Sequence, residues 1–268
     1  MNSALSTIAF VKASACGNDF LLIDYSLAPR DADIHAFTQR ICNRHDGVGA
    51  DGVEWMLPHP SADAEIRLIN ADGSDAEISG NGTRCVAAYL CSEQGKEKCT
   101  IQTGAGLKTC ILTSRSGWEY EFEIEMGEAL VDLELDLKTT NGEVRGIPVS
   151  MGNPHFVIFR PEFAADWQEH AAEIQRDPHF AQGVNVEFVV VESRHDVRVR
   201  FFERGVGETQ SSGTGSCASA AAAMTTGRTD SPVKVHAPGG TQTVRRENMH
   251  IFLRGSARLV CRGEFLLG

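Results

Sequence analysis

The chain has 268 residues, which is enough for one large domain or for two lobes of about 130 residues each. Its 36 acidic and 25 basic residues give a formal net charge of −11, which disfavours general binding of nucleic acids or anionic membranes. No apolar run approaches the roughly 18 residues of a membrane helix, and the N-terminus lacks the pattern of a secretory signal. We therefore expect a cytoplasmic globular protein without nucleic-acid or membrane partners.

Eight cysteines are spread along the chain without any C-x-x-C pair. In a chain without an export signal, this spacing favours reduced thiols over disulfides. Cysteines and histidines also fail to form pairs at the intervals of zinc ligands, so no metal site is predicted.

The hydrophobic pattern predicts strands interrupted by helices. In chain order, the predicted elements are a helix over 31–45, a strand over 65–69, a helix over 83–93, a strand over 119–124, strands over 186–189 and 197–201, and a helix over 214–226. The strands alternate polar and apolar residues, as half-buried strands do. The second and third helices are apolar and rich in alanine, which suits helices at the centre of a lobe, and Gly227 is placed to cap the third.

One pattern occurs twice, about half the chain apart. The sequence R-L-I-N-A-D-G-S-D-A-E-I-S-G-N-G over 67–82 aligns without gaps with R-F-F-E-R-G-V-G-E-T-Q-S-S-G-T-G over 200–215, at an offset of 133. This repetition predicts an α+β fold of two pseudo-symmetric lobes, each a curved antiparallel sheet around a central helix. We expect the lobes to span residues 1–128 and 129–268, with the last strand free to return to the first lobe.

In each lobe a strand leads into a glycine-rich turn that opens a buried helix. The turns are Ser79-Gly80-Asn81-Gly82 and Ser212-Gly213-Thr214-Gly215. Free backbone N–H groups and the positive end of the helix dipole make such a turn an anion site, and two copies would suit a small carboxylate and stabilise negative charge beside it. Turns that merely cap their helices are the alternative interpretation.

The residues upstream of these turns differ between the lobes. The first lobe offers Asn70 and Asp72, whereas the second offers Glu203 and Arg204. Arg204 can pair with a carboxylate and Glu203 can receive an ammonium group, which together describe an amino acid. The motif G-x-G-x-x-G at 47–52 follows a helix-like segment instead of a strand, so it predicts no dinucleotide site.

Several motifs, in this order along residues 10–240, resemble the diaminopimelate epimerase family. They are Gly17-Asn18-Asp19-Phe20, Arg44-His45 with Gly47-Val48-Gly49, Asn70-Ala71-Asp72-Gly73-Ser74, Gly80-Asn81-Gly82-Thr83-Arg84-Cys85, Met151-Gly152-Asn153-Pro154-His155, and Glu203-Arg204-Gly205 with Gly207-Glu208-Thr209-Gln210. The resemblance implies a two-lobed isomerase that epimerises LL-diaminopimelate to meso-diaminopimelate without pyridoxal phosphate, another cofactor or a metal. It further implies a cytoplasmic homodimer that serves the synthesis of lysine and cell-wall precursors.

The same resemblance assigns the site residues. Two residues, one from each lobe, would remove and return the α-proton, and the positions of these catalytic residues are Ser79 and Ser212. The positions that would bind the substrate are Asn18, Asn70, Gly80, Asn81, Asn153, Asn185, Glu203, Arg204, Gly213 and Thr214. Of these, Glu203 and Arg204 would hold the distal end of the amino acid.

The sequence departs from the family pattern at the two catalytic positions, where the family has cysteine and this chain has Ser79 and Ser212. A thiol titrates near pH 8.5, whereas a serine hydroxyl has no accessible anion without a neighbouring base. The nearest carboxylates in the sequence are Glu77 and Glu208, and nothing in the sequence shows that either reaches a hydroxyl. Cys85 and Cys217, inside the helices, are predicted to be core thiols.

Three hypotheses stay open at this point. The serines are native and competent, or they are the cysteine-to-serine form of an ordinary epimerase. The third hypothesis is a non-catalytic amino-acid-binding protein, or an isomerase of another amino acid, such as one bearing an imidazole.

Overall fold

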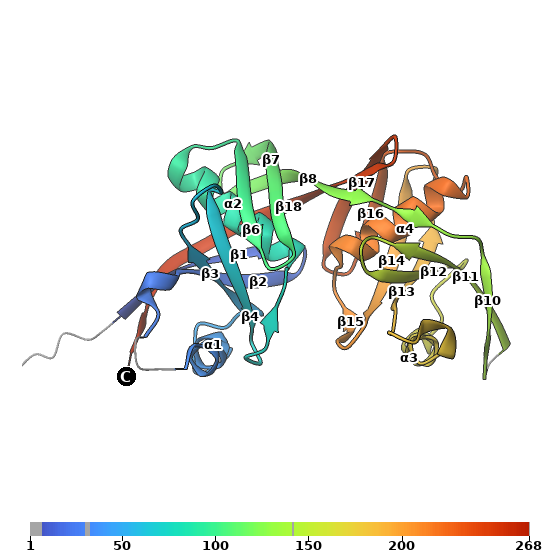
Figure 1. Cartoon of the computed structure of the whole chain (residues 1–268), viewed down its shortest axis with the longest axis horizontal. Coiled ribbons are helices and arrows are strands. Elements are labelled where there is room, and N and C mark those ends of the chain that lie inside the picture. The colour runs from blue at the N-terminus through green and yellow to red at the C-terminus, as the bar shows by residue number, and fades with distance from the viewer. Residues whose placement is uncertain (1–6, 30–32, 141, 268) are drawn as a thin grey trace, which may run out of the picture. The chain divides into compact units, whose positions relative to one another are not determined.

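The structure, a computed structural model, describes residues 7–29, 33–140 and 142–267 (Figure 1). The chain divides into two compact units, which are Met1–Ile124 with Gly255–Gly268 (unit 1) and Glu125–Arg254 (unit 2). It passes from unit 1 to unit 2 within one long strand and returns within the last one. The lobe boundary after residue 128 stays a prediction.

The first unit begins with two strands and alternates short hairpins with two α-helices. Its elements are β1 (Thr7–Ala15), β2 (Asn18–Asp24), the 3₁₀ helix η1 (Tyr25–Leu27), α1 (Ile34–Cys42), β3 (Gly52–Leu57), β4 (Ala64–Asn70), β5 (Asp75–Ala76), α2 (Gly80–Gln94), β6 (Lys98–Thr103), β7 (Gly106–Ser116) and β8 (Glu119–Glu128). The pairs β2–β3 and β4–β6 are parallel, whereas β3–β4 and β6–β7 are antiparallel.

The second unit begins with two additional strands and then repeats this order of strands and α-helices, except that its 3₁₀ helix follows the first α-helix. Its elements are β9 (Leu130–Val131), β10 (Leu135–Thr139), β11 (Gly142–Ser150), β12 (Pro154–Phe159), α3 (Trp167–Gln175), the 3₁₀ helix η2 (Pro178–Phe180), β13 (Asn185–Val191), β14 (Asp196–Glu203), β15 (Gly207–Thr209), α4 (Gly213–Thr225), β16 (Val233–Ala237), β17 (Gly240–Glu247) and β18 (His250–Leu266). The pairs β12–β13 and β14–β16 are parallel, and β13–β14 and β16–β17 are antiparallel. The predicted α+β fold is confirmed, but the parallel pairs make the sheet of each unit mixed instead of antiparallel as predicted.

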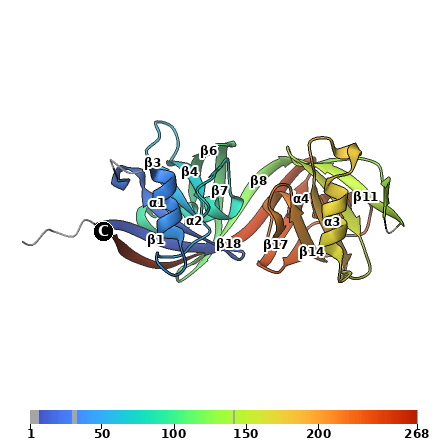
Figure 2. The same ribbon diagram turned by 90° about the horizontal axis from the view of Figure 1, so that it is seen from below.

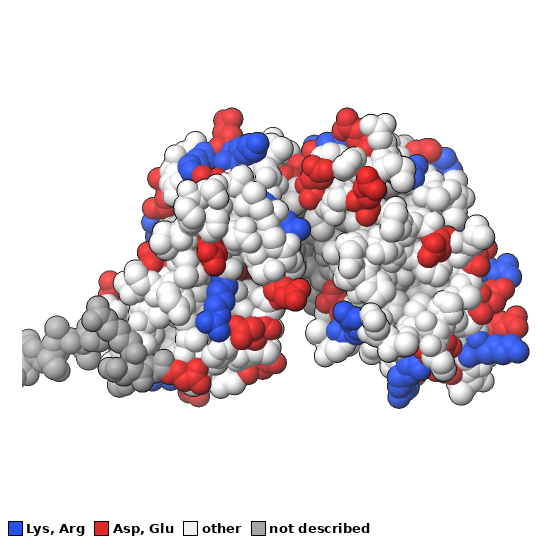
Figure 3. All heavy atoms as spheres, viewed as in Figure 1, with Lys and Arg blue, Asp and Glu red and all other residues white. Residues whose placement is uncertain are grey.

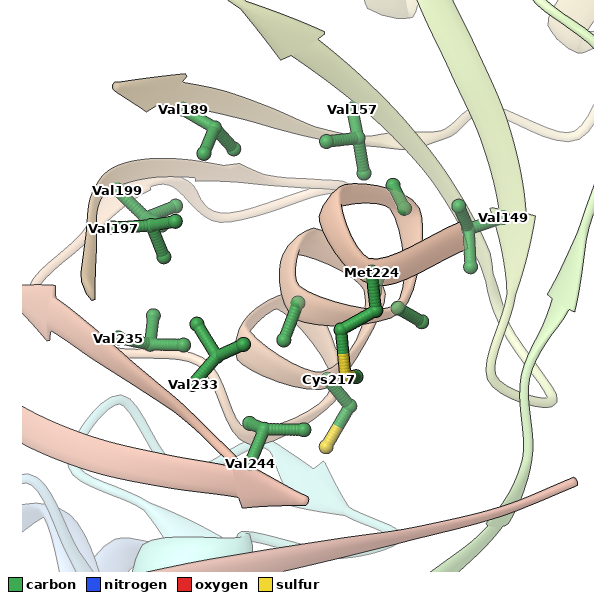
Figure 4. Close-up of a cluster of buried hydrophobic side chains, with 14 of the residues drawn as sticks. Val149, Val157, Val189, Val197, Val199, Cys217, Met224, Val233, Val235 and Val244 are labelled. Carbon is green, nitrogen blue, oxygen red and sulfur yellow. The ribbon is translucent and has the colours of Figure 1, made fainter. Parts of the chain in front are cut away.

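Each unit has one helix among its strands and one outside them (Figures 1 and 2). In unit 2, α4 contacts β11, β12, β13, β14, β16 and β17. Its alanines lie opposite inward-facing valines, among which Val157, Val189 and Val244 point toward the helix in Figure 4. Because alanine has the smallest apolar side chain, the strands can surround the helix closely without leaving voids.

The outer helices pack on the sheets from the other side. In unit 1, α1 buries Phe37 and Ile41 against Val53 and Trp55 of β3. The helix is shorter than predicted because Asn43 leaves the helical region, with φ −59° and ψ 128°. Residues 30–32, which include part of the predicted helix, lie outside the described residues.

The predicted central helices are confirmed, with small differences in their ends. The helix α2 begins at Gly80, three residues before its predicted start, because Ser79 caps it. The C-cap of α4 is Thr226, and the predicted cap, Gly227, follows with the left-handed φ of 69° that glycine tolerates.

The surface carries charges of both signs. Figure 3 shows acidic and basic side chains interspersed on the visible face, with large uncharged areas between them. Several acidic groups are paired with arginines, such as Asp136 with Arg145 and Asp230 with Arg194. In the described part of the chain, no helix is long and apolar enough to cross a membrane.

Candidate functional site

The two predicted catalytic serines are N-caps of the two central helices. Ser79 Oγ accepts a hydrogen bond of 3.1 Å from Gly82 N–H at the start of α2. Ser212 Oγ accepts a hydrogen bond of the same length from Gly215 N–H at the start of α4. Such caps stabilise a helix by about 1 kcal/mol each, and they leave each hydroxyl proton free to be donated.

Both serines lie where a helix dipole favours negative charge. The first turns of α2 and α4 expose backbone N–H groups with the equivalent of about half a positive charge. A Cβ built on Gly80 would meet no atom of the described residues within 4 Å, so there is room beside Gly80, whereas Asn81 is buried.

In unit 1 the structure brings Asn18 and Asn81 together. Asn81 Nδ2 donates to Asn18 Oδ1 at 2.7 Å, and Asn18 Nδ2 donates to Asp51 Oδ2 at 3.0 Å. Arg84, which is fully buried, donates to Asn81 Oδ1 from the next turn of α2. These hydrogen bonds fix the orientation of the Asn81 side chain at the start of α2.

Asp51 belongs to a charged network at the same edge of the sheet. Arg44 pairs with Asp19 at 2.7 Å and with Asp51 at 2.8 Å, and Lys12 pairs with Asp19 at 2.9 Å. Burial opposes ionisation of Asp19, but hydrogen bonds from Arg44 and Lys12 outweigh it and lower the pKa of Asp19. Arg44, Asp19 and Asp51 thus hold the loop before β3 in place.

Asn70 follows a different arrangement. It ends β4, and its Nδ2 donates to Ser74 Oγ at 3.0 Å within the turn that also carries Asp72. A substrate contact by Asn70 requires that this bond be exchanged.

In unit 2 a buried chain of hydrogen bonds leads from the loop into the core. Asn153 Nδ2 donates to Thr214 Oγ1 at 3.4 Å, and His155 Nε2 donates to Asn153 Oδ1 at 3.0 Å. His155 Nδ1 lies 2.7 Å from Glu187 Oε1, and both side chains are buried. Nε2 of His155 uses its hydrogen to donate to Asn153. The hydrogen bond between His155 Nδ1 and Glu187 Oε1 therefore needs a second proton, which one of these two atoms carries.

Glu187 packs directly beneath α4. A Cβ built on Gly215 would lie 2.9 Å from Glu187 Oε1 and 2.9 Å from Phe201. Burial raises the pKa of Glu187, and the neighbouring His155 opposes this effect. Glycine at position 215 is thus required by the close approach of the carboxyl to the helix.

Three further predicted residues of unit 2 form one group. Asn185 Nδ2 donates to Pro154 O at 3.0 Å, and Asn185 Oδ1 accepts from Arg204 N–H at 2.9 Å. The Arg204 guanidinium donates to Gln182 O at 2.7 Å and is otherwise exposed, and Glu203 ends β14. Asn185 therefore orients the backbone of the Glu203-Arg204 pair.

The carboxylates nearest in sequence do not serve the serines in this structure. Glu77 is exposed, and Glu208 accepts a hydrogen bond of 3.1 Å from Gln168 of α3. Cys85 and Cys217 are fully buried, and burial raises the pKa of Cys85, as expected for core thiols.

The sequence reasoning missed Glu54 in unit 1 and Glu187 in unit 2. Both lie under the first turn of a central helix, and Glu54 Oε1 would be 1.8 Å from a Cβ on Gly82. A signal was present, because the offset of 133 also aligns Val53-Glu54-Trp55 with Val186-Glu187-Phe188.

The motif at 47–52 also has a structural explanation. It leads into β3 at Gly52 instead of opening a helix, which agrees with its exclusion as a dinucleotide site. Gly47 approaches three carbonyl oxygens around the end of α1, the nearest 2.4 Å from a built Cβ, so glycine is needed there for packing.

Comparison with known proteins shows the family of the chain. A family model described as diaminopimelate epimerase matches residues 10–131 and 147–260. The chain is 37% identical to a diaminopimelate epimerase of Pelotomaculum thermopropionicum, with 96% of this chain and 98% of the relative covered, and 35% identical to one of Desulfitobacterium hafniense, with 96% and 97% covered.

Among solved structures, a phenazine biosynthesis protein of the PhzF family from Bacillus anthracis has the same fold. Its TM-score is 0.73 at 16% identity, with 97% of this chain and 99% of that chain covered. The residues that the family model matches include both serine-capped loops and the Glu203-Arg204 pair. The chain therefore belongs to the diaminopimelate epimerase family of isomerases.

Proposed function

We propose that this protein epimerises LL-diaminopimelate to meso-diaminopimelate by acid–base chemistry at the α-carbon, without pyridoxal phosphate or a metal. The observation that carries the proposal is the pair of serine-capped helix N-termini, at the positions that the resemblance assigns to acid–base catalysis, in a chain that the family model matches over residues 10–131 and 147–260. Family membership supports the substrate, because the relatives named above are diaminopimelate epimerases.

In this proposal Ser79 and Ser212 exchange protons with the α-carbon. The backbone N–H groups of Gly80, Asn81, Gly213 and Thr214 bind the reacting carboxylate. The positive ends of α2 and α4 then stabilise the negative charge that develops when the α-proton leaves. Because a hydroxyl ionises much less readily than a thiol, each serine needs a neighbouring base to accept its proton.

The remaining predicted residues hold the substrate. Arg204 pairs with the distal carboxylate and Glu203 with the distal ammonium group, while Asn185 positions their backbone. Asn18, Asn70 and Asn153 supply amide groups, of which Asn18 and Asn153 are already oriented by Asn81 and Thr214. We also propose that the enzyme is a cytoplasmic homodimer in the synthesis of lysine and cell-wall precursors.

The test is α-proton exchange in D₂O with LL- and meso-diaminopimelate, combined with calorimetric binding. The protein with Ser79 and Ser212 is compared with the double variant Ser79→Cys, Ser212→Cys. We expect binding by both proteins and faster exchange by the double variant, because thiols ionise near pH 8.5. Absence of binding and of exchange in both proteins would refute the proposed substrate.

The acid–base assignment needs its own control. The variant Cys85→Ser changes a buried thiol six residues after Ser79 and is expected to leave exchange within about twofold, since Cys85 lies in the core. A loss of exchange in this variant comparable to that in Ser79→Ala would contradict the assignment of Ser79.

A further inference from the structure

Glu54 is a fully buried carboxyl group that no described residue satisfies. Its exposed fraction is 0%, and neither Oε1 nor Oε2 has a hydrogen-bond partner in the part of the chain that the structure describes. An unpartnered carboxyl in a protein core is unfavourable when ionised, and an apolar side chain of similar size would avoid that penalty. Its presence therefore requires an explanation other than packing.

The position of Glu54 connects it to the Ser79 loop. Glu54 lies in β3, where its register neighbours are Leu22 of β2 and Leu68 of β4. The carboxyl lies under the first turn of α2, since a Cβ on Gly82 would be 1.8 Å from Glu54 Oε1. The same point is 3.3 Å from Ser79 Cβ, so Glu54 and Ser79 flank Gly82 as near neighbours.

The other unit carries a carboxyl at the equivalent place. Glu187 follows Glu54 by 133 residues, as Ser212 follows Ser79, and it packs on Gly215 as Glu54 packs on Gly82. Glu187 is bonded to His155, however, whereas Glu54 lacks any partner among the described residues. Glu187 Oε2 also lacks a partner in the described part of the chain, so what distinguishes Glu54 is that both of its oxygens are unpaired and available to a neighbouring hydroxyl.

The surroundings of Glu54 allow it to hold or release a proton near neutral pH. Burial among apolar neighbours raises the pKa of Glu54 to about 8. The titratable group that interacts electrostatically with Glu54 is the Cys85 thiol of α2, whose pKa burial raises.

We propose that Glu54 is the proton-exchange partner of Ser79, an inference that rests on the proposed function. When Ser79 Oγ takes the α-proton, its own hydroxyl proton passes to the Glu54 carboxylate, and the electrons of the Cα–H bond stay on the substrate carbanion. In the reverse direction, protonated Glu54 returns its proton to Ser79 Oγ as the hydroxyl proton passes to the carbanion.

Glu54 acts only through Ser79 and is a positioning residue that does not touch the substrate. Ser79 Oγ already accepts the Gly82 N–H bond, so its hydroxyl proton is free for Glu54. The two side chains are not hydrogen-bonded in the structure, so the transfer requires a rotation of one of them.

The experiment compares α-proton exchange, its KM and its pH profile from pH 6 to 10. The variants are Glu54→Gln and Glu54→Leu, each in the serine protein and in the Ser79→Cys, Ser212→Cys background. We expect kcat in the serine protein to fall by about 10²- to 10⁴-fold, with KM little changed. The pH profile of exchange should also lose the change in rate near pH 8. In the cysteine background the loss should be below tenfold, because a thiol has its own accessible anion.

Two controls separate this role from a structural one. Glu77→Gln removes an exposed carboxylate next to the same loop and should leave exchange within about twofold. Glu54→Leu fits between Leu22 and Leu68, so it separates loss of the carboxyl from loss of folding.

The outcomes are distinct. Unchanged exchange in both Glu54 variants, or equal losses in the serine and cysteine backgrounds, would overturn the role of Glu54. So would a serine protein that exchanges no proton while the cysteine variant does, a result that would keep the proposed substrate but refute proton exchange by the two serines. Absence of binding and exchange in every protein would refute the proposed function itself.

Discussion

The buried carboxyl of Glu54 should make the stability of unit 1 depend on pH. The pKa of Glu54 rises from 4.5 to about 8 in the folded protein, so the folded state holds a proton that the unfolded state releases between these values. Stability is therefore fully present below pH 4.5 and is lost as the pH rises to 8. At 1.36 kcal/mol per pH unit, the loss between pH 5 and pH 9 is about 4 kcal/mol.

The variant Glu54→Gln removes this titration while keeping the size of the side chain. The free energy of unfolding of the variant, relative to the wild type, should increase by about 4 kcal/mol from pH 5 to pH 9. Trp55, buried next to Glu54 in β3, reports unfolding by fluorescence once Trp118 and Trp167 are replaced by phenylalanine.

Urea unfolding of both proteins at pH 5, 7 and 9 measures the difference. The matched control is Glu77→Gln, whose exposed carboxylate should give the same pH dependence as the wild type. Parallel curves for the wild type and Glu54→Gln across this range would refute the argument, because Glu54 would then be ionised in the core or in contact with water.

Two other substitutions test packing at the helix N-termini. Gly82→Ala places a methyl group against Glu54 and should destabilise unit 1 by about 1–3 kcal/mol in urea unfolding. Gly80→Ala faces open space and should change this stability by less than about 1 kcal/mol. Equal effects of the two variants would contradict the packing of Gly82 on Glu54. In unit 2, His155→Leu leaves Glu187 unpaired and should lower the free energy of unfolding by about 3–5 kcal/mol. Adding Glu187→Leu should recover most of this loss in a double-mutant cycle, and additive losses would contradict the pairing.

Much of the fold was readable from the sequence because the signals are local. Glycine-rich turns after alternating strands mark where α2 and α4 begin, and the alanine content of α4 indicates a helix that larger neighbours surround. Because the pattern repeats at an offset of 133, the same strand, turn and helix are predicted in both units. The end of α1 was predicted less well, because it depends on the backbone turn at Asn43.

The roles of individual predicted site residues depend on contacts that the sequence does not contain. Asn18 and Asn81 are 63 residues apart and meet only because β2 and α2 begin close together in the folded unit. The substrate contact of Asn185 stays a prediction, and in the structure its amide bonds to Pro154 and Arg204. Pairings of this kind follow from the register of the strands.

The sequence by itself determined the repeat, the two serine-capped helices and the family pattern around them, because each depends on residues close together in the chain. Only the tertiary structure decided the environment of Glu54. In the alternating strand Val53-Glu54-Trp55, a glutamate between two apolar residues is typical of a face turned to solvent. Here α1 covers one face of the sheet and α2 the other, so both faces are buried and Glu54 lies in the core beneath Ser79.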